Sequence, residues 1–199
     1  MRPIPVDEPW LERWLARLGP RGRHLLELGC GPGQDAATLC AAGFDVVALD
    51  RSVPMLALAR LRAPGSQLVR ADISAPLPFP DRTFDAAVAS LSMHYLPWVQ
   101  TRAAFAEVRR VLRSGRPFLF RVNATDDINH GAGVGVEVER HLYRAAPGAH
   151  AELKRFFDEG SVREAVAGLF RVEALSHVTV HRFEQPKRAW ECLAVAERL

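Results

Sequence analysis

The stretch "LLELGCGPGQDA" (residues 25–36) places three glycines in five positions, directly after an apolar run. They are Gly29, Gly31 and Gly33, and an alanine-rich segment follows them. A glycine inside regular structure costs roughly 0.5–1 kcal/mol relative to alanine. Three of them together indicate a tight turn between a strand and a helix, where another group comes close to the main chain.

Apolar runs and helical segments alternate on both sides of this turn. The predicted strands cover residues 24–28, 45–50, 67–72, 84–91 and 117–122, and the predicted helices cover residues 34–42, 53–61 and 97–112. Alternation at this spacing is typical of βαβ units, so we expect an α/β fold with a parallel sheet. Two later candidate strands, residues 170–180 and 190–198, have no clear helix between them and are expected to pair antiparallel.

The remaining segments fit one domain. Residues 7–18 predict an N-terminal helix capped by Asp7, residues 123–150 are polar, Gly-rich and aperiodic, and a helix is expected at 151–168. A chain of 199 residues has the length of one ordinary domain. We therefore expect a single domain over 1–199, with an N-terminal helix (1–20), a ligand-binding half (21–122) and a substrate-side part (123–199).

The amino-acid composition limits which kinds of partner and which cellular compartment we expect. The 26 basic residues include only two lysines, Lys154 and Lys187, and 23 acidic residues are mixed among the arginines. That is not the footprint of a nucleic-acid-binding protein. No apolar run reaches the roughly 18 residues of a membrane span, and the three cysteines lack metal-site spacing. We expect a cytoplasmic protein without metal, membrane or nucleic-acid partner.

The spacing of the glycines separates two classes of nucleotide site. Dinucleotide sites use G-x-G-x-x-G, but Gln34 stands at the third glycine position, and no Gly-Lys-Ser/Thr of a P-loop follows. The pattern is instead E-x-G-x-G-x-G, beginning at Glu27. Asp50, at the end of the second predicted strand, is suited to accept hydrogen bonds from two ribose hydroxyls. After the third strand, the Asp72 side chain and the Ile73 N–H are suited to an adenine ring.

These motifs resemble the class I S-adenosylmethionine-dependent methyltransferases, in the family's order, over residues 22–122. The resemblance implies a Rossmann-like, seven-stranded, mostly parallel sheet with helices on both faces and an antiparallel last strand. It also implies that S-adenosylmethionine is the cofactor, with its methionine part beside the glycine loop, its ribose on Asp50 and its adenine on Asp72. The implied cofactor-binding residues are Glu27, Gly29, Cys30, Gly31, Gly33, Asp50, Arg51, Met55, Asp72, Ile73 and Ser90.

The residues after the fourth strand are expected to face the transferring methyl group. His94 and Tyr95 are candidate catalytic residues there, although simple packing against the cofactor would explain them as well. Asp127, in the 123–150 loop, is a third candidate, and its alternative is a loop cap. We expect this loop to be an acceptor-side lid. His130, His141 and His150 are spaced too widely to indicate a metal site.

A small-molecule acceptor fits the fourth-strand motif "SLSMHYL" (residues 90–96) best. This motif lacks the Asn/Asp-Pro-Pro-aromatic set of enzymes that methylate amino groups in nucleic acids and glutamine. The segment "NATDDINHGAG" (residues 123–133) resembles, over a short stretch, the tellurite-resistance branch of the family, whose acceptors are metalloid oxyanions. A nucleic-acid or protein methyltransferase and a non-catalytic cofactor sensor remain alternatives, and the oligomeric state is open.

Overall fold

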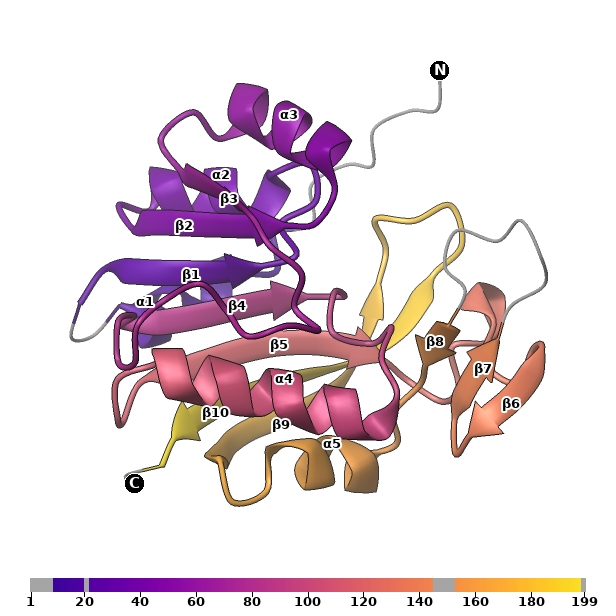
Figure 1. The fold of residues 1–199 in the computed structure, drawn as a ribbon. Helices are drawn as coiled ribbons and strands as arrows, with labels where there is room; N and C mark the ends of the chain where they lie inside the picture. The colour runs from indigo at the N-terminus through magenta and orange to yellow at the C-terminus, as the bar shows by residue number, and fades with distance from the viewer. Residues whose placement is uncertain (1–8, 20–21, 145–152, 198–199) are drawn as a thin grey trace.

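The computed structural model describes residues 9–19, 22–144 and 153–197, and there the chain is built around a seven-stranded sheet with the order β3-β2-β1-β4-β5-β10-β9 (Figure 1). Strands β1 to β5 run parallel to their neighbours, and β10 pairs antiparallel with both β5 and β9. The bounds are β1 His24–Leu28, β2 Asp45–Asp50, β3 Gln67–Arg70, β4 Ala86–Ser90, β5 Pro117–Asn123, β9 Phe170–Val180 and β10 Lys187–Ala196. The predicted fold class is confirmed.

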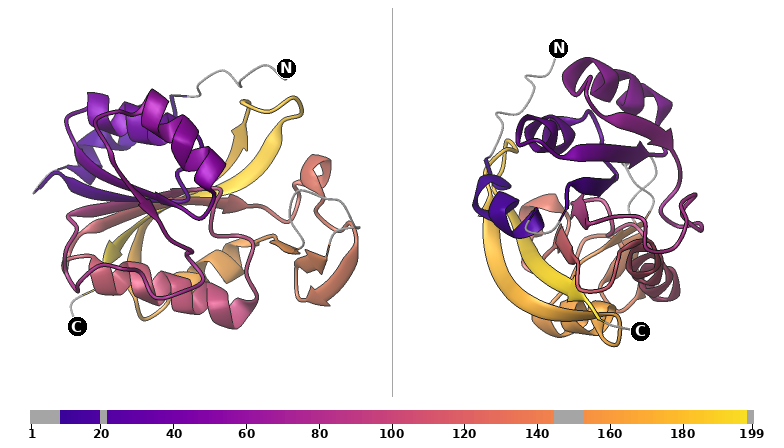
Figure 2. Two further views of the ribbon diagram at one scale, coloured as in Figure 1. Left: turned by 45° about the horizontal axis from the view of Figure 1, so that its top comes forward. Right: turned by 90° about the vertical axis from the view of Figure 1, so that its left-hand side faces the viewer.

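Helices cover both faces of this sheet (Figure 2). The helices are η1 Glu12–Trp14, α1 Leu15–Leu18, α2 Gln34–Ala41, α3 Val53–Arg62, α4 Trp98–Val111 and α5 Glu159–Val166. Side chains alternate across a strand, so Leu25 of β1 packs in the same core cluster as Leu39 of α2, whereas Leu26 packs in the cluster of Phe105 from α4. Two apolar cores, one on each face, therefore hold the sheet.

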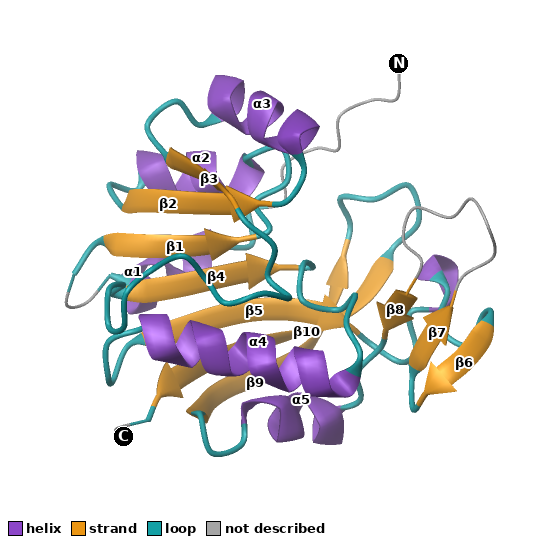
Figure 3. Ribbon diagram, viewed as in Figure 1, coloured by secondary structure: helices purple, strands orange, loops and turns teal. Residues whose placement is uncertain are grey.

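The segment that the sequence predicts as a long aperiodic loop contains regular structure. Residues 128–130 form the short helix η2, and β6 Val136–Glu139, β7 Leu142–Arg144 and β8 Leu153–Arg155 form a second, antiparallel sheet (Figure 3). The expected helix over 151–168 is correspondingly shorter, because β8 replaces its start and α5 begins only at Glu159. Three-residue strands carry too little alternation to be recognised in a sequence.

The arginines of α4 pair with neighbouring segments of the chain. Arg109 is buried and donates to the carbonyl oxygen of Glu197, while Arg102 donates to three carbonyls at the end of α5. Arg110 bonds to Glu107 and Asp81. These guanidinium groups fix neighbouring segments to the helix.

The helix predicted over residues 7–18 is helical in part where the structure describes it. Within residues 9–19, η1 and α1 cover residues 12–18, and Asp7 lies outside the described residues. Trp10, just before η1, is buried and donates from its indole Nε1 to the Asp35 carboxylate at 3.0 Å. No helix within the described part of the chain is long and apolar enough to span a membrane.

Candidate active site

A cavity of about 360 Å³ lies at the carboxyl edge of the parallel strands. The ends of β1, β4 and β5 point to the side where the β9–β10 turn and the small β6–β7–β8 sheet lie (Figure 1). The cavity wall takes residues from the glycine loop, from the segment after β4, from η2, from β8 and from the β9–β10 hairpin. Ligands of open α/β sheets bind at this edge, so the site combines early and late parts of the chain.

The three glycines lack a side chain for different reasons, although all three have positive φ angles. A Cβ atom on Gly29 would lie 2.4 Å from the Cβ of Ser92, and one on Gly33 would lie 2.8 Å from the Cα of Ala59. A Cβ on Gly31 would have no neighbour within 4 Å. Gly29 and Gly33 are therefore required by packing, whereas Gly31 alone of the three leaves its Cα open to a ligand.

Two carboxylates lie on the glycine-loop side of the cavity, Glu27 from β1 and Asp35 from α2. Burial raises the pKa of Glu27 well above its ordinary range, the charges of Asp35 and Asp50 raise it further, and only Arg182 opposes them. The Oε2 atom of Glu27 has no hydrogen-bond partner among the described residues. A buried acceptor without a partner is unfavourable, so this wall is suited to a cationic ligand group.

Asp50 and Asp72 stand beyond the cavity wall, at the adjacent ends of β2 and β3. Asp50 accepts hydrogen bonds from the backbone N–H of Gly31 and of Ser52, both at 2.8 Å, and so holds the glycine loop against β2. Asp72 accepts from Ser74, and its other oxygen lies 4.0 Å from Arg51. Gly33, Met55 and Ile73 also lie off the cavity wall. Their predicted cofactor contacts stay predictions.

His94 and Tyr95 do reach the cavity, with Glu27, Gly29, Cys30, Gly31 and Ser90 of the predicted set. Neither ring nitrogen of His94 has a hydrogen-bond partner among the described residues, and burial lowers its pKa well below the usual value. Its ring lies 4.2 Å from that of Tyr95. Leu91, on the same wall, has a φ of 56°, a conformation that is strained for a leucine. The segment after β4 is thus held in a costly shape beside the cavity.

Asp127 lies behind the cavity wall, where it orients two groups that do line it. Its Oδ1 atom is 3.0 Å from Nδ1 of His130, and its Oδ2 accepts from Nζ of Lys187 at 2.7 Å. Asp127 is 1% exposed and also accepts from the Arg188 N–H. Asp127, predicted as a catalytic residue, therefore does not line the cavity, whereas its hydrogen-bond partner His130 does. His141 lies apart, 3.7 Å from Asp158, and His150 is outside the described residues.

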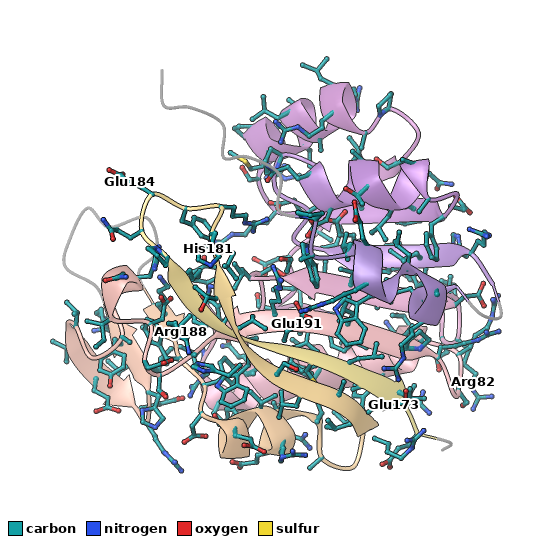
Figure 4. All side chains as sticks on the ribbon, turned by 180° about the vertical axis from the view of Figure 1, so that it is seen from behind. Arg82, Glu173, His181, Glu184, Arg188 and Glu191 are labelled. Atoms are coloured by element: carbon teal, nitrogen blue, oxygen red, sulfur yellow. The ribbon has the colours of Figure 1, made fainter. Side chains whose placement is uncertain are left out.

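Sequence reasoning missed three cations on the wall: Lys154 from β8, and Arg182 and Lys187 from the β9–β10 hairpin. Burial, together with the charge of Lys187, lowers the pKa of Lys154 to about 8. Figure 4 shows the hairpin from behind, with His181 and Glu184 near its turn and Arg188 and Glu191 on β10. In the sequence, the signal that sets the two lysines apart is their rarity among 26 basic residues.

The sequence is similar to known methyltransferases. Residues 25–115 match a family model described as a methyltransferase domain. A malonyl-[acyl-carrier protein] O-methyltransferase of Pseudescherichia vulneris is 35% identical over 133 residues, which cover 65% of this chain and 52% of that protein. The chain spans about half the length, or less, of such relatives.

Solved structures share this fold. A structure described as an S-adenosylmethionine-dependent methyltransferase from Methanosarcina mazei has a TM-score of 0.78 at 18% identity, covering 97% of this chain and 99% of that one. A 1,6-didemethyltoxoflavin-N1-methyltransferase of Burkholderia thailandensis, solved with bound 1,6-didemethyltoxoflavin and S-adenosylhomocysteine, has a TM-score of 0.72 at 24% identity, covering 96% of this chain and 80% of that one. At these identities the likeness establishes the fold.

Proposed function

We propose that this chain, a member of the class I S-adenosylmethionine-dependent methyltransferases, transfers a methyl group from S-adenosylmethionine to a small-molecule acceptor. The family gives the reaction class, and the cavity at the carboxyl edge gives the place. The cavity of about 360 Å³ has a glycine-loop side for the cofactor and, opposite, a side bordered by the β9–β10 hairpin and the small sheet, where a small acceptor would bind.

The observation that carries this proposal is the pairing of Gly31 with Glu27 on one wall. Gly31 leaves its Cα open, and the buried Glu27 carboxylate on the same cavity wall has an oxygen without a hydrogen-bond partner among the described residues. The cofactor's methionine part carries an ammonium, a sulfonium and a carboxylate. The ammonium would bind at Glu27, and the carboxylate would bind at Arg182, whose charge already acts on Glu27 and Asp35. The residues present therefore fit the cofactor.

Asp50 would bind the ribose of the cofactor in addition to holding the glycine loop against β2. Its two oxygens each accept one backbone hydrogen bond, from Gly31 and from Ser52, which orients the carboxylate and leaves further lone pairs free. We propose that Arg51 after β2, Met55 in the first turn of α3, and Asp72 and Ile73 after β3 surround the adenine side.

The bound cofactor supplies an activated methyl group, and the protein's task is to align the acceptor and exclude water. His94 and Tyr95 form an uncharged wall for this, since burial lowers the pKa of His94 and raises that of Tyr95. Where an acceptor must lose a proton, His130 is the placed base. The Asp127 carboxylate orients the imidazole through the Nδ1 atom of His130. Burial lowers the pKa of His130, which keeps its ring neutral near pH 7.

Calorimetry on the purified protein tests the proposal. S-adenosylmethionine and S-adenosylhomocysteine should bind, and NAD should bind far more weakly because Gln34 replaces the third glycine of a dinucleotide site. Tighter binding of NAD would contradict the cofactor assignment. Turnover of labelled S-adenosylmethionine with a panel of small acceptors then separates an enzyme from a cofactor sensor, which would bind the cofactor and methylate none of them.

A further inference from the structure

Both lysines of this chain line the same cavity. Of 26 basic residues only Lys154 and Lys187 are lysine, and they come from β8 and from the start of β10, distant in sequence. Arginine serves at the described surface ion pairs and at the ties of α4. A lysine ammonium is a compact point charge, unlike the planar arginine fork. The cavity thus holds the chain's two compact cations.

The charge of this lysine pair is incompletely balanced. Lys187 donates to Asp127 at 2.7 Å, whereas Lys154 donates to the carbonyl oxygen of His130 at 2.7 Å. An ammonium has three N–H donors, so each keeps donors for a ligand. The two carboxylates on the cavity wall, Glu27 and Asp35, belong to the glycine-loop side. Lys187 is buried and Lys154 is half-buried, and two like charges with one paired carboxylate between them are unfavourable until an anion joins them.

We propose that the methyl acceptor carries an anionic oxygen group, a carboxylate or a phosphate, that binds against the ammonium groups of Lys154 and Lys187. This inference rests on the proposed function and adds the substrate class. His94 borders the same region, because both lysine charges act on its ring. Its two unpartnered nitrogens offer a further hydrogen bond to the bound acceptor.

The cofactor's own carboxylate does not account for these lysines. Arg182 supplies a guanidinium next to the Glu27 and Asp35 side, where the methionine end would bind. One carboxylate needs one such group. Lys154 and Lys187 act on His94 instead, at the end of the cavity that also holds His130. Aromatic side chains, Tyr95 and Phe183, complete the wall there, so the acceptor has an apolar body beside its anionic group.

Matched ligands test this on protein saturated with S-adenosylhomocysteine. Calorimetry compares benzoate and phenyl phosphate, two aromatic anions, with neutral benzamide. Lys154→Met is the main variant, because Lys187 also neutralises the buried Asp127 and its removal leaves that carboxylate unpaired. Arg60→Met on exposed α3 removes the same charge away from the cavity and is the control. Thermal unfolding checks that each variant is folded.

At least one anion should bind at least about tenfold more tightly than benzamide, as hydrogen bonds to a charged group would give. Lys154→Met should weaken that anion about tenfold or more, with S-adenosylhomocysteine affinity kept within a few-fold, and Arg60→Met should change neither. Benzamide binding as well as the anions, no anion binding at all, or equal binding to Lys154→Met would overturn the inference while leaving the cofactor assignment intact. Absence of S-adenosylhomocysteine binding would instead overturn the proposed function.

Discussion

Alanine substitutions at Gly31 and Gly33 should damage this protein in different ways, one through the ligand and one through the fold. Both residues have positive φ, 52° and 82°. Left-handed backbone costs a non-glycine residue about 1–2 kcal/mol, and alanine recovers about 0.4–1 kcal/mol through the unfolded chain. Gly31→Ala should therefore lower the free energy of unfolding by only about 1 kcal/mol.

Gly33→Ala adds a steric term, because its Cβ would lie 2.8 Å from the Cα of Ala59 and push α3 away from the glycine loop. Overpacking of this kind costs typically about 1–3 kcal/mol, so the total loss is about 3 kcal/mol. For a chain of this size that corresponds to a Tm drop of roughly 6–12 °C, against roughly 2–4 °C for Gly31→Ala.

The ligand measurement should reverse the order. A methyl group on Gly31 enters the open space beside Glu27, so Gly31→Ala should weaken S-adenosylhomocysteine binding about tenfold or more in calorimetry at a temperature where both variants are folded. Gly115→Ala is the matched control, since Gly115 has a φ of 72°, no atom near its Cβ position and no part in the cavity wall. It should lose the same stability as Gly31→Ala and no affinity. Unchanged affinity in Gly31→Ala would refute the placement of the cofactor.

Three further predictions follow from the site. Asp50→Ala should weaken S-adenosylhomocysteine binding more than Asp72→Ala, because Asp50 also holds the glycine loop; equal losses in calorimetry would contradict this. Asp127→Asn should slow turnover while cofactor affinity stays within a few-fold, because the Asp127 carboxylate lies behind the cavity wall and orients His130 on it; unchanged turnover would remove Asp127 from the mechanism. The folded pKa of Lys154, about 8, lies below its ordinary value of 10.5, so the unfolded chain binds more protons between these pH values and stability rises with pH there. The Tm difference between wild type and Lys154→Met should move in favour of wild type from pH 8 to 10, and a constant difference would count against the buried charge.

The sheet and the glycine loop could be predicted because their signals are local and repeated. Each βαβ unit carries an apolar run of strand length and a helical segment, and β1, β2 and α2 fall at or within one residue of their predicted bounds. The glycine motif is equally local, and its carboxylate partner on β2 follows at a fixed spacing. These features need no knowledge of how distant segments meet.

The acceptor side could not be predicted in this way. Lys154, Arg182 and Lys187 reach the cavity only because β10 reverses direction and because β8 adds to a small sheet. The antiparallel pairing of β9 and β10 was predicted and is confirmed, but the position of their turn at the cavity and the three-residue strand β8 have no periodic signal in the sequence. The candidate role of Asp127 stays a prediction, and its contacts with His130 and Lys187 depend on the hairpin being folded. Charge composition held the remaining clue, two lysines among many arginines.

The reversal of β10 has an evolutionary consequence. Because β10 runs antiparallel to β5, the turn before it, residues 181–186, projects at the cavity while the strand itself stays paired along its length. Insertions or substitutions in that turn leave the β5–β10 pairing in place. The turn contributes Arg182 and Phe183 to the cavity wall, whereas Glu27, the glycines and Asp35 lie on β1, the glycine loop and α2, far away in the sequence. Under the proposed function, substitutions at Phe183 would therefore change the acceptor end of the cavity while the sheet and the glycine loop stay as they are.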